Sequence, residues 1–182
     1  MHVSRLWTIL GCILLGLASR LLPHPPNFTA VNAIALLGAC YFGSRWLACA
    51  TVFFLLILSD WVLGFHSTVP FVYFSVGIAV VMGRQLEACS SSGRVASLSW
   101  VSSCIFFLIT NFGVWVADTL YPKNAEGLCA CYLAALPFFA NQVCGDVFYS
   151  LLLFSGAYLF QSKQSGLVSL RCADLSASQK YL

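Results

Sequence analysis

The stretch that decides the fold is WLACATVFFLLILSDWVLGF, residues 46–65. Asp60 is its one charged residue, and a bilayer core penalises each centrally placed charge by about 2.5 to 3.5 kcal/mol. An α-helix of roughly 20 residues rises about 30 Å, which is the thickness of the hydrocarbon core of a bilayer. The stretch therefore predicts a helix that crosses a membrane.

The composition of the whole chain indicates the same surroundings. Of its 182 residues, 60% are hydrophobic and 8% are charged, and the mean hydropathy is +0.87. A soluble domain carries roughly 25% charged residues to cover its surface, so lipid is the expected partner of this surface. The formal net charge of +3 is too small to indicate nucleic acid as a partner.

Apolar segments predict an all-α fold, a polytopic membrane helix bundle of about six transmembrane helices. The segments cover residues 6–22, 28–43, 46–65, 69–86 and 95–117, with a last one that ends at residue 160. We expect the first to remain as an uncleaved helix, because further apolar segments follow it. The second is short and close to the third, so it forms either a tight helical hairpin with the third, which we favour, or a partly inserted element.

The last segment contains Pro137 and several polar residues. Proline removes a backbone donor, and the residue before it avoids helical geometry. We therefore expect a short helix over about 128–136 and, after a break, a spanning helix from about residue 138. Residues 1–161 then form a single transmembrane domain, and the polar tail 162–182 is expected to be cytoplasmic and mobile.

Basic residues predict the orientation. With six spans, the side opposite the N-terminus carries two of them, Arg20 and Lys123. The side of the N-terminus carries Arg5, Arg45, Arg84, Arg94, Lys163, Arg171 and Lys180. Because cytoplasmic loops carry the excess of Lys and Arg, we expect both termini to be cytoplasmic in a multi-pass protein of the cell membrane.

Polar residues inside the apolar segments gather near the predicted outer ends. An ionisable residue within a membrane marks a site or a pathway by default. Asn111, Trp115 and Asp118 are spaced at i, i+4 and i+7, so they are expected to share one helical face. We therefore expect an outward-facing, substrate-binding pocket. Its candidate residues are His24, Asn27, Asn32, Asp60, His66, Asn111, Trp115, Asp118, Gln142 and Asp146. The alternative is that these residues bind one another or cap helix ends near the interface.

Trp61 and Trp115 lie beside these candidates in the sequence. They either form an aromatic wall for a flat organic ligand or belong to the aromatic belts of the membrane interfaces.

Small residues recur at Ala35, Ala39 and Gly43, on one stripe of the second segment. Such a stripe lets helices approach closely, either for packing within the chain or for docking to another membrane subunit. The nine cysteines sit mostly in apolar runs, where a thiol acts as a small hydrophobe, and no spacing of Cys and His indicates a metal site.

Four blocks of sequence carry a family resemblance. They are RLLPHPPNFT at 20–29, LSD at 58–60 leading to GFH at 64–66, TNFGVW at 110–115 and GDVFYS at 145–150. The blocks resemble an uncharacterised bacterial family of small six-span membrane proteins that are named as transport proteins. More distantly, the chain is similar to the S components of energy-coupling-factor vitamin transporters. This resemblance implies the bacterial inner membrane, a small-molecule substrate and a partner made of a transmembrane scaffold with ATPase subunits.

The sequence contains no motif typical of an enzyme. It has no Gly-x-Ser-x-Gly elbow, no glycine-rich phosphate loop and no His-Glu-x-x-His pair. We therefore expect neither catalysis nor a cofactor or metal. The favoured hypothesis is a membrane transport protein that captures a small, vitamin-like molecule from the outer side for uptake. The alternative is a non-catalytic structural membrane subunit of an envelope complex.

Overall fold

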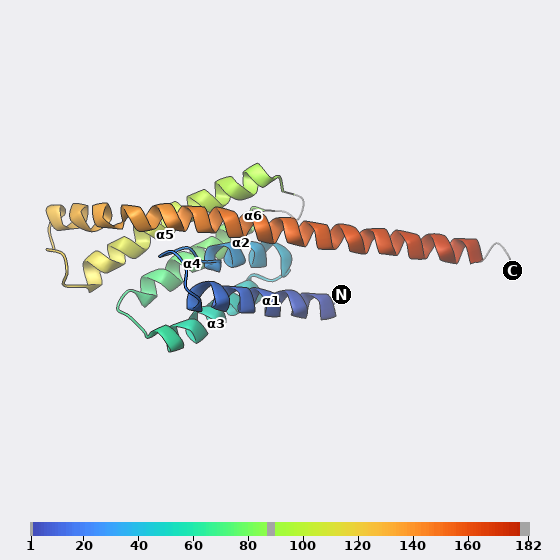
Figure 1. The fold of residues 1–182 in the computed structure, drawn as a ribbon, viewed down its shortest axis with the longest axis horizontal. Helices are drawn as coiled ribbons and strands as arrows, with labels where there is room; N and C mark the ends of the chain where they lie inside the picture. The colour runs from blue at the N-terminus through green and yellow to red at the C-terminus, as the bar shows by residue number, and fades with distance from the viewer. Residues whose placement is uncertain (1, 87–89, 179–182) are drawn as a thin grey trace.

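The protein is built from α-helices (Figure 1). The computed structural model describes residues 2–86 and 90–178. In this part of the chain the helices are α1 (His2–Leu21), α2 (Val31–Tyr41), α3 (Arg45–Leu63), α4 (Val69–Gly83), α5 (Ser92–Ala117) and α6 (Ala125–Ser178). None of the described residues forms a strand. The prediction of an all-α bundle of six helices is confirmed.

Three of the helices are long and apolar enough to cross a membrane. They are α3, α5 and the Ala125–Leu159 part of α6. The apolar parts of α1, α2 and α4 are shorter, at Leu6–Leu21, Val31–Tyr41 and Val69–Gly83. Large apolar side chains such as Trp61, Phe74 and Leu108 are exposed on the outside of the bundle, where water would be an unfavourable neighbour. The helices therefore indicate a membrane protein.

The short helix α2 lies at the centre of the bundle. Its residues from Val31 to Gly38 are all buried, and it contacts each of the other helices. Its length is about 16 Å at 1.5 Å per residue, roughly half of a hydrocarbon core. Residues 42–44 connect it to α3, as expected for a helical hairpin. Because protein surrounds α2, the helix does not have to match the thickness of a bilayer.

The small residues of α2 pack within the chain. Ala35 is fully buried, which leaves it no surface for a partner. A Cβ added to Gly83 of α4 would lie 2.5 Å from the carbonyl oxygen of Leu36 and 2.9 Å from the Cβ of Ala39. The two helices therefore touch backbone to backbone. Gly43 does not continue this stripe as predicted, because α2 ends at Tyr41 and Gly43 lies in the following turn with φ of 68°.

The expected separate helix over 128–136 is not present, because α6 continues through Pro137. A proline inside a membrane helix is tolerated where neighbouring elements compensate for the lost hydrogen bond. Here α5 holds α6 on both sides of the proline. Tyr132 donates to the carbonyl of Leu108, and Gln142 donates to the carbonyl of Ser103. The backbone of the expected tail also continues α6 as far as Ser178, and residues 179–182 lie outside the described part.

The connections between helices divide the bundle into two ends (Figure 1). One end carries the connections 22–30, 64–68 and 118–124, and we call it the loop end. The opposite end carries the start of α1, the turn between α2 and α3, the end of α4, the start of α5, and the C-terminal part of α6. The polar residues expected at the outer ends of the spans therefore belong to one end of the structure.

Candidate ligand cavity

A cavity of ≈ 510 Å³ lies at the loop end of the bundle. All of the helices α1 to α6 contribute to its wall, together with the connections 22–30 and 64–68. Small-molecule sites in proteins commonly have volumes of about 300 to 1,000 Å³. The cavity is therefore large enough for a small organic molecule.

Most of the residues predicted for a pocket line this cavity. They are His24, Asn27, Asn32, His66, Asn111, Gln142 and Asp146. They come from segments that lie far apart in the sequence, so the fold itself brings them together. Their geometry agrees with a pocket, and a role in binding stays a prediction.

Three of the predicted residues, Asp60, Trp115 and Asp118, do not line the cavity. Asp60 lies behind its wall and is 2% exposed. Trp115 donates from Nε1 to the carbonyl of Pro122 in the connection between α5 and α6. Asp118 is exposed and accepts a hydrogen bond from the amide of Thr119. The predicted shared face of α5 fails at Asp118, because the helix ends at Ala117 and the backbone is extended at the next residue.

One polar group at the cavity wall is the Asp146 cluster, which consists of Asn32, Ser103, Gln142 and Asp146, and all of these but Ser103 line the cavity. Asn32 donates from Nδ2 to Oδ2 of Asp146 at 2.9 Å, and Ser103 donates to the same oxygen at 2.7 Å. All four residues are buried. The cluster joins α2, α5 and α6, so it both holds these helices together and presents polar atoms to the cavity.

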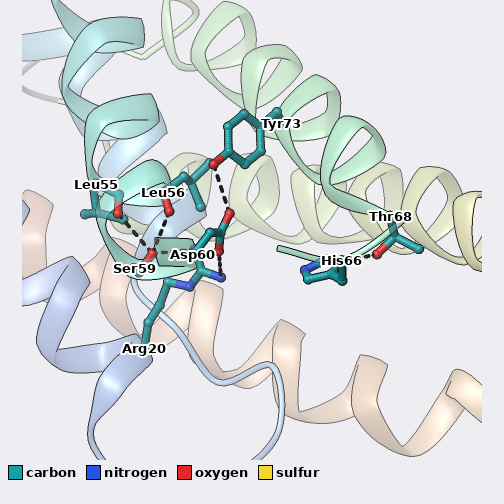
Figure 2. A network of polar contacts seen from close by, with 8 residues as sticks. All are labelled: Arg20, Leu55, Leu56, Ser59, Asp60, His66, Thr68 and Tyr73. Carbon is teal, nitrogen blue, oxygen red and sulfur yellow. Dashed lines mark hydrogen bonds and ion pairs between the residues drawn. The ribbon is translucent and has the colours of Figure 1, made fainter. Parts of the chain in front are cut away.

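A second polar group, the Asp60 cluster, connects α1, α3 and α4 (Figure 2). Arg20 forms an ion pair with Asp60, with 2.7 Å between Nη2 and Oδ1, and also donates to Ser59 at 2.7 Å. Tyr73 donates to the other carboxylate oxygen of Asp60 at 2.9 Å. Two opposite charges are therefore paired inside the bundle, as ionisable groups in a membrane require.

The partners in the Asp60 cluster were not among the predicted site residues. Arg20 was counted as a topology charge, and Tyr73 was not proposed as a site residue. A charged residue at the end of an apolar helix, with an opposite charge at the same end of another helix, is the signal that could have indicated the pair.

Aromatic side chains form part of the cavity wall, but they are not the predicted tryptophans. Trp61 is 78% exposed and points away from the bundle interior. Phe106, Phe107 and Phe138 line the cavity instead. Phe107 is packed against Phe139, with 4.5 Å between the ring centroids. The wall of the cavity therefore contains both polar and aromatic side chains.

The two histidines of the wall are held by local hydrogen bonds. Nδ1 of His24 lies 2.7 Å from the carbonyl oxygen of Leu22, and Nδ1 of His66 lies 2.7 Å from the hydroxyl of Thr68 (Figure 2). A carbonyl oxygen only accepts, so His24 carries its proton on Nδ1. In each case, a hydrogen bond within the same connection between helices orients the histidine ring.

Fold and cavity together define a helical membrane protein with a polar pocket at one end of the bundle. The chain belongs to a family of unknown function, DUF6580, whose family model matches residues 2–169. No curated protein and no solved structure matches the chain. The description of the family names no transport activity, so the transport role that the resemblance implied is a proposal.

Proposed function

We propose that the protein is a multi-pass inner-membrane protein that captures a small molecule from the outer side for uptake. The observation that carries the proposal is the ≈ 510 Å³ cavity, whose wall holds polar side chains from the connections 22–30 and 64–68 and from α1, α2, α5 and α6. Convergent polar groups in an apolar, largely preformed cavity are typical of a small-molecule site. Both termini lie on the cytoplasmic side in this proposal.

The distribution of basic residues supports an outward-facing cavity. Arg45, Arg84 and Arg94 lie at the end opposite the loop end, next to the connections there. At the loop end lie Arg20, whose charge is paired with Asp60, and Lys123, so the larger number of unpaired basic residues is at the opposite end. Because unpaired basic residues favour the cytoplasmic side, the cavity opens toward the outside.

Uptake requires more than a cavity. The captured molecule has to cross the membrane, either through a rocking motion of the helices or with the help of a partner. The resemblance to S components favours a transmembrane scaffold with ATPase subunits as that partner. Neither catalysis nor a cofactor is part of this proposal.

A structural subunit of an envelope complex is the second candidate. The observation in its favour is the Asp60 cluster, in which a predicted site residue connects helices instead of facing the cavity. Under this candidate, the polar residues would stabilise the fold and no small molecule would bind.

A cavity-filling substitution separates the two candidates. Val114 lines the cavity on α5, and Val116, two residues later, is 45% exposed on the outside. We expect that the purified wild type and Val116→Trp are stabilised by at least one compound in a panel of vitamins, nucleobases and amino acids. Val114→Trp should lose that stabilisation because the indole occupies the cavity. The measurement is the melting temperature with and without each compound.

Absence of a melting shift in the wild type, with every class of compound, would favour the structural subunit. Equal shifts in the wild type and Val114→Trp would place the binding site outside this cavity.

A further inference from the structure

Asp146 is a buried carboxyl group on the cavity wall whose hydrogen-bond partners are uncharged. Its side chain is 2% exposed, and the hydrogen bonds from Asn32 and Ser103 both end on Oδ2. In the part of the chain that the structure describes, the one ion pair is that of Arg20 with Asp60. A buried carboxylate without a counter-charge is costly in a membrane. A cationic ligand would supply the partner that the fold does not.

Asn32 provides a second acceptor beside this carboxylate. The residue is 4% exposed, and its Nδ2 donates to Asp146. Its Oδ1 is buried and has no hydrogen-bond partner. Buried polar atoms in folded proteins are almost always satisfied, and a bound group with several N–H donors would satisfy this one. The unpartnered oxygen therefore indicates a ligand that donates hydrogen bonds.

The formal charges of the Arg and Asp side chains at the cavity sum to one negative charge. Arg20 lines the cavity, but Asp60 neutralises its guanidinium at 2.7 Å, so these two charges cancel. Asn32 is the second residue of α2, and the N-terminus of a helix carries about half a positive charge. That half charge offsets only part of the charge of Asp146. The remaining field favours a cation over an anion.

The shape and lining of the cavity favour an organic cation over a bare ion. Its ≈ 510 Å³ far exceeds the space that one ion occupies, and Phe106, Phe107 and Phe138 line it. Aromatic faces attract ammonium groups. Among the described residues, no group of three or more His, Cys, Asp or Glu side chains is placed to hold a metal ion.

We infer that the captured molecule is an organic amine whose ammonium group binds Asp146 and donates to Asn32 Oδ1. The aromatic side of the cavity then contacts the apolar body of the molecule. This inference rests on the proposed capture function and adds the chemical class of the ligand.

A charge-matched panel tests the inference. Each probe is a trio with one carbon skeleton, as in tryptamine (cation), tryptophol (neutral) and indole-3-acetate (anion), and sodium chloride is tested alone. The readout is the melting temperature of the purified full chain, followed by the Kd of each compound that shifts it. The variants are Asp146→Asn, which keeps the size of the side chain, and Glu126→Gln, the same change at an exposed residue in the first turn of α6.

We expect cationic members to bind and their neutral and anionic partners to bind much more weakly. Asp146→Asn should weaken cation binding by about 30-fold or more, since removal of one partner from a buried charge pair costs at least about 2 kcal/mol. Glu126→Gln should bind as the wild type does. The melting temperature of Asp146→Asn without ligand shows whether the variant is folded.

Four other results would contradict the inference. Binding of neutral or anionic members with equal or higher affinity would overturn the amine class and leave the capture function standing. Retention of the wild-type affinity for cations by folded Asp146→Asn would likewise overturn the amine class and leave the capture function standing. Stabilisation by sodium alone that depends on Asp146 would replace the organic amine by an ion. Failure of every probe to bind, while a compound of the vitamin, nucleobase and amino-acid panel stabilises the wild type, would overturn the amine class alone. Failure of both panels would overturn the capture function as well.

Discussion

Asp60 and Asp146 are both 2% exposed and both lie toward the loop end, yet their surroundings differ. Asp60 has a cation, Arg20, and a phenol, Tyr73, so each carboxylate oxygen has a partner within 3 Å. Among the described residues, Asp146 has uncharged neighbours only, which are the amide of Asn32 and the hydroxyl of Ser103, both on Oδ2, and the side-chain amide of Gln142. The first carboxylate is neutralised by the fold and stabilises it. The second lines the cavity and is the carboxylate that our proposal assigns to the ligand.

The largest expected change in the free energy of unfolding is at the ion pair between Arg20 and Asp60. Arg20→Leu should lower the free energy of unfolding by about 3 to 5 kcal/mol, because it leaves Asp60 buried without a counter-charge. The measurement is reversible unfolding of the purified protein in a bilayer mimic.

The double variant Arg20→Leu with Asp60→Leu is the matched control. It should recover most of the loss, since replacement of both partners by apolar groups is often neutral. A single variant as stable as the wild type would show that Asp60 does not depend on Arg20.

A smaller loss of stability is expected when the phenol hydroxyl of Tyr73 is removed. Tyr73→Phe removes one hydrogen bond to a charged group and should lower the free energy of unfolding by about 1.5 to 3 kcal/mol. Tyr158→Phe makes the same change at an exposed position of α6 and should have little effect. If Tyr73→Phe were as stable as Tyr158→Phe, the hydrogen bond from Tyr73 to Asp60 in Figure 2 would not contribute to stability.

The number and type of helices were predictable because uninterrupted apolar runs allow few alternatives. The residues at which the helices begin and end were less predictable. The break at Pro137 was expected from local backbone chemistry, whereas contacts with α5 on both sides of the proline hold α6 as one helix. The end of α5 at Ala117 was also not evident, and this excluded Asp118 from the expected face.

The candidate site was predictable as a region but not as a set of contacts. Residues such as His24, Asn111 and Asp146 could be assigned to one end of the bundle from their depth in each segment. The bond between Asn32 and Asp146 joins residues 114 positions apart, and the bond between Arg20 and Asp60 joins residues 40 apart. Such pairings depend on which helices become neighbours, and no local pattern contains that information.

The most direct test of the difference between the two carboxylates is the same substitution at each, Asp60→Asn and Asp146→Asn. For both, the melting temperature is measured without ligand and with a compound that stabilises the wild type. We predict that Asp60→Asn melts well below the wild type and that its folded form still gains stability from the compound. Asp146→Asn should melt within a few degrees of the wild type and gain much less stability from the compound than the wild type does. Equal losses of stability in the two variants, or a ligand shift that survives in Asp146→Asn and vanishes in Asp60→Asn, would contradict the assignment of Asp60 to the fold and Asp146 to the ligand.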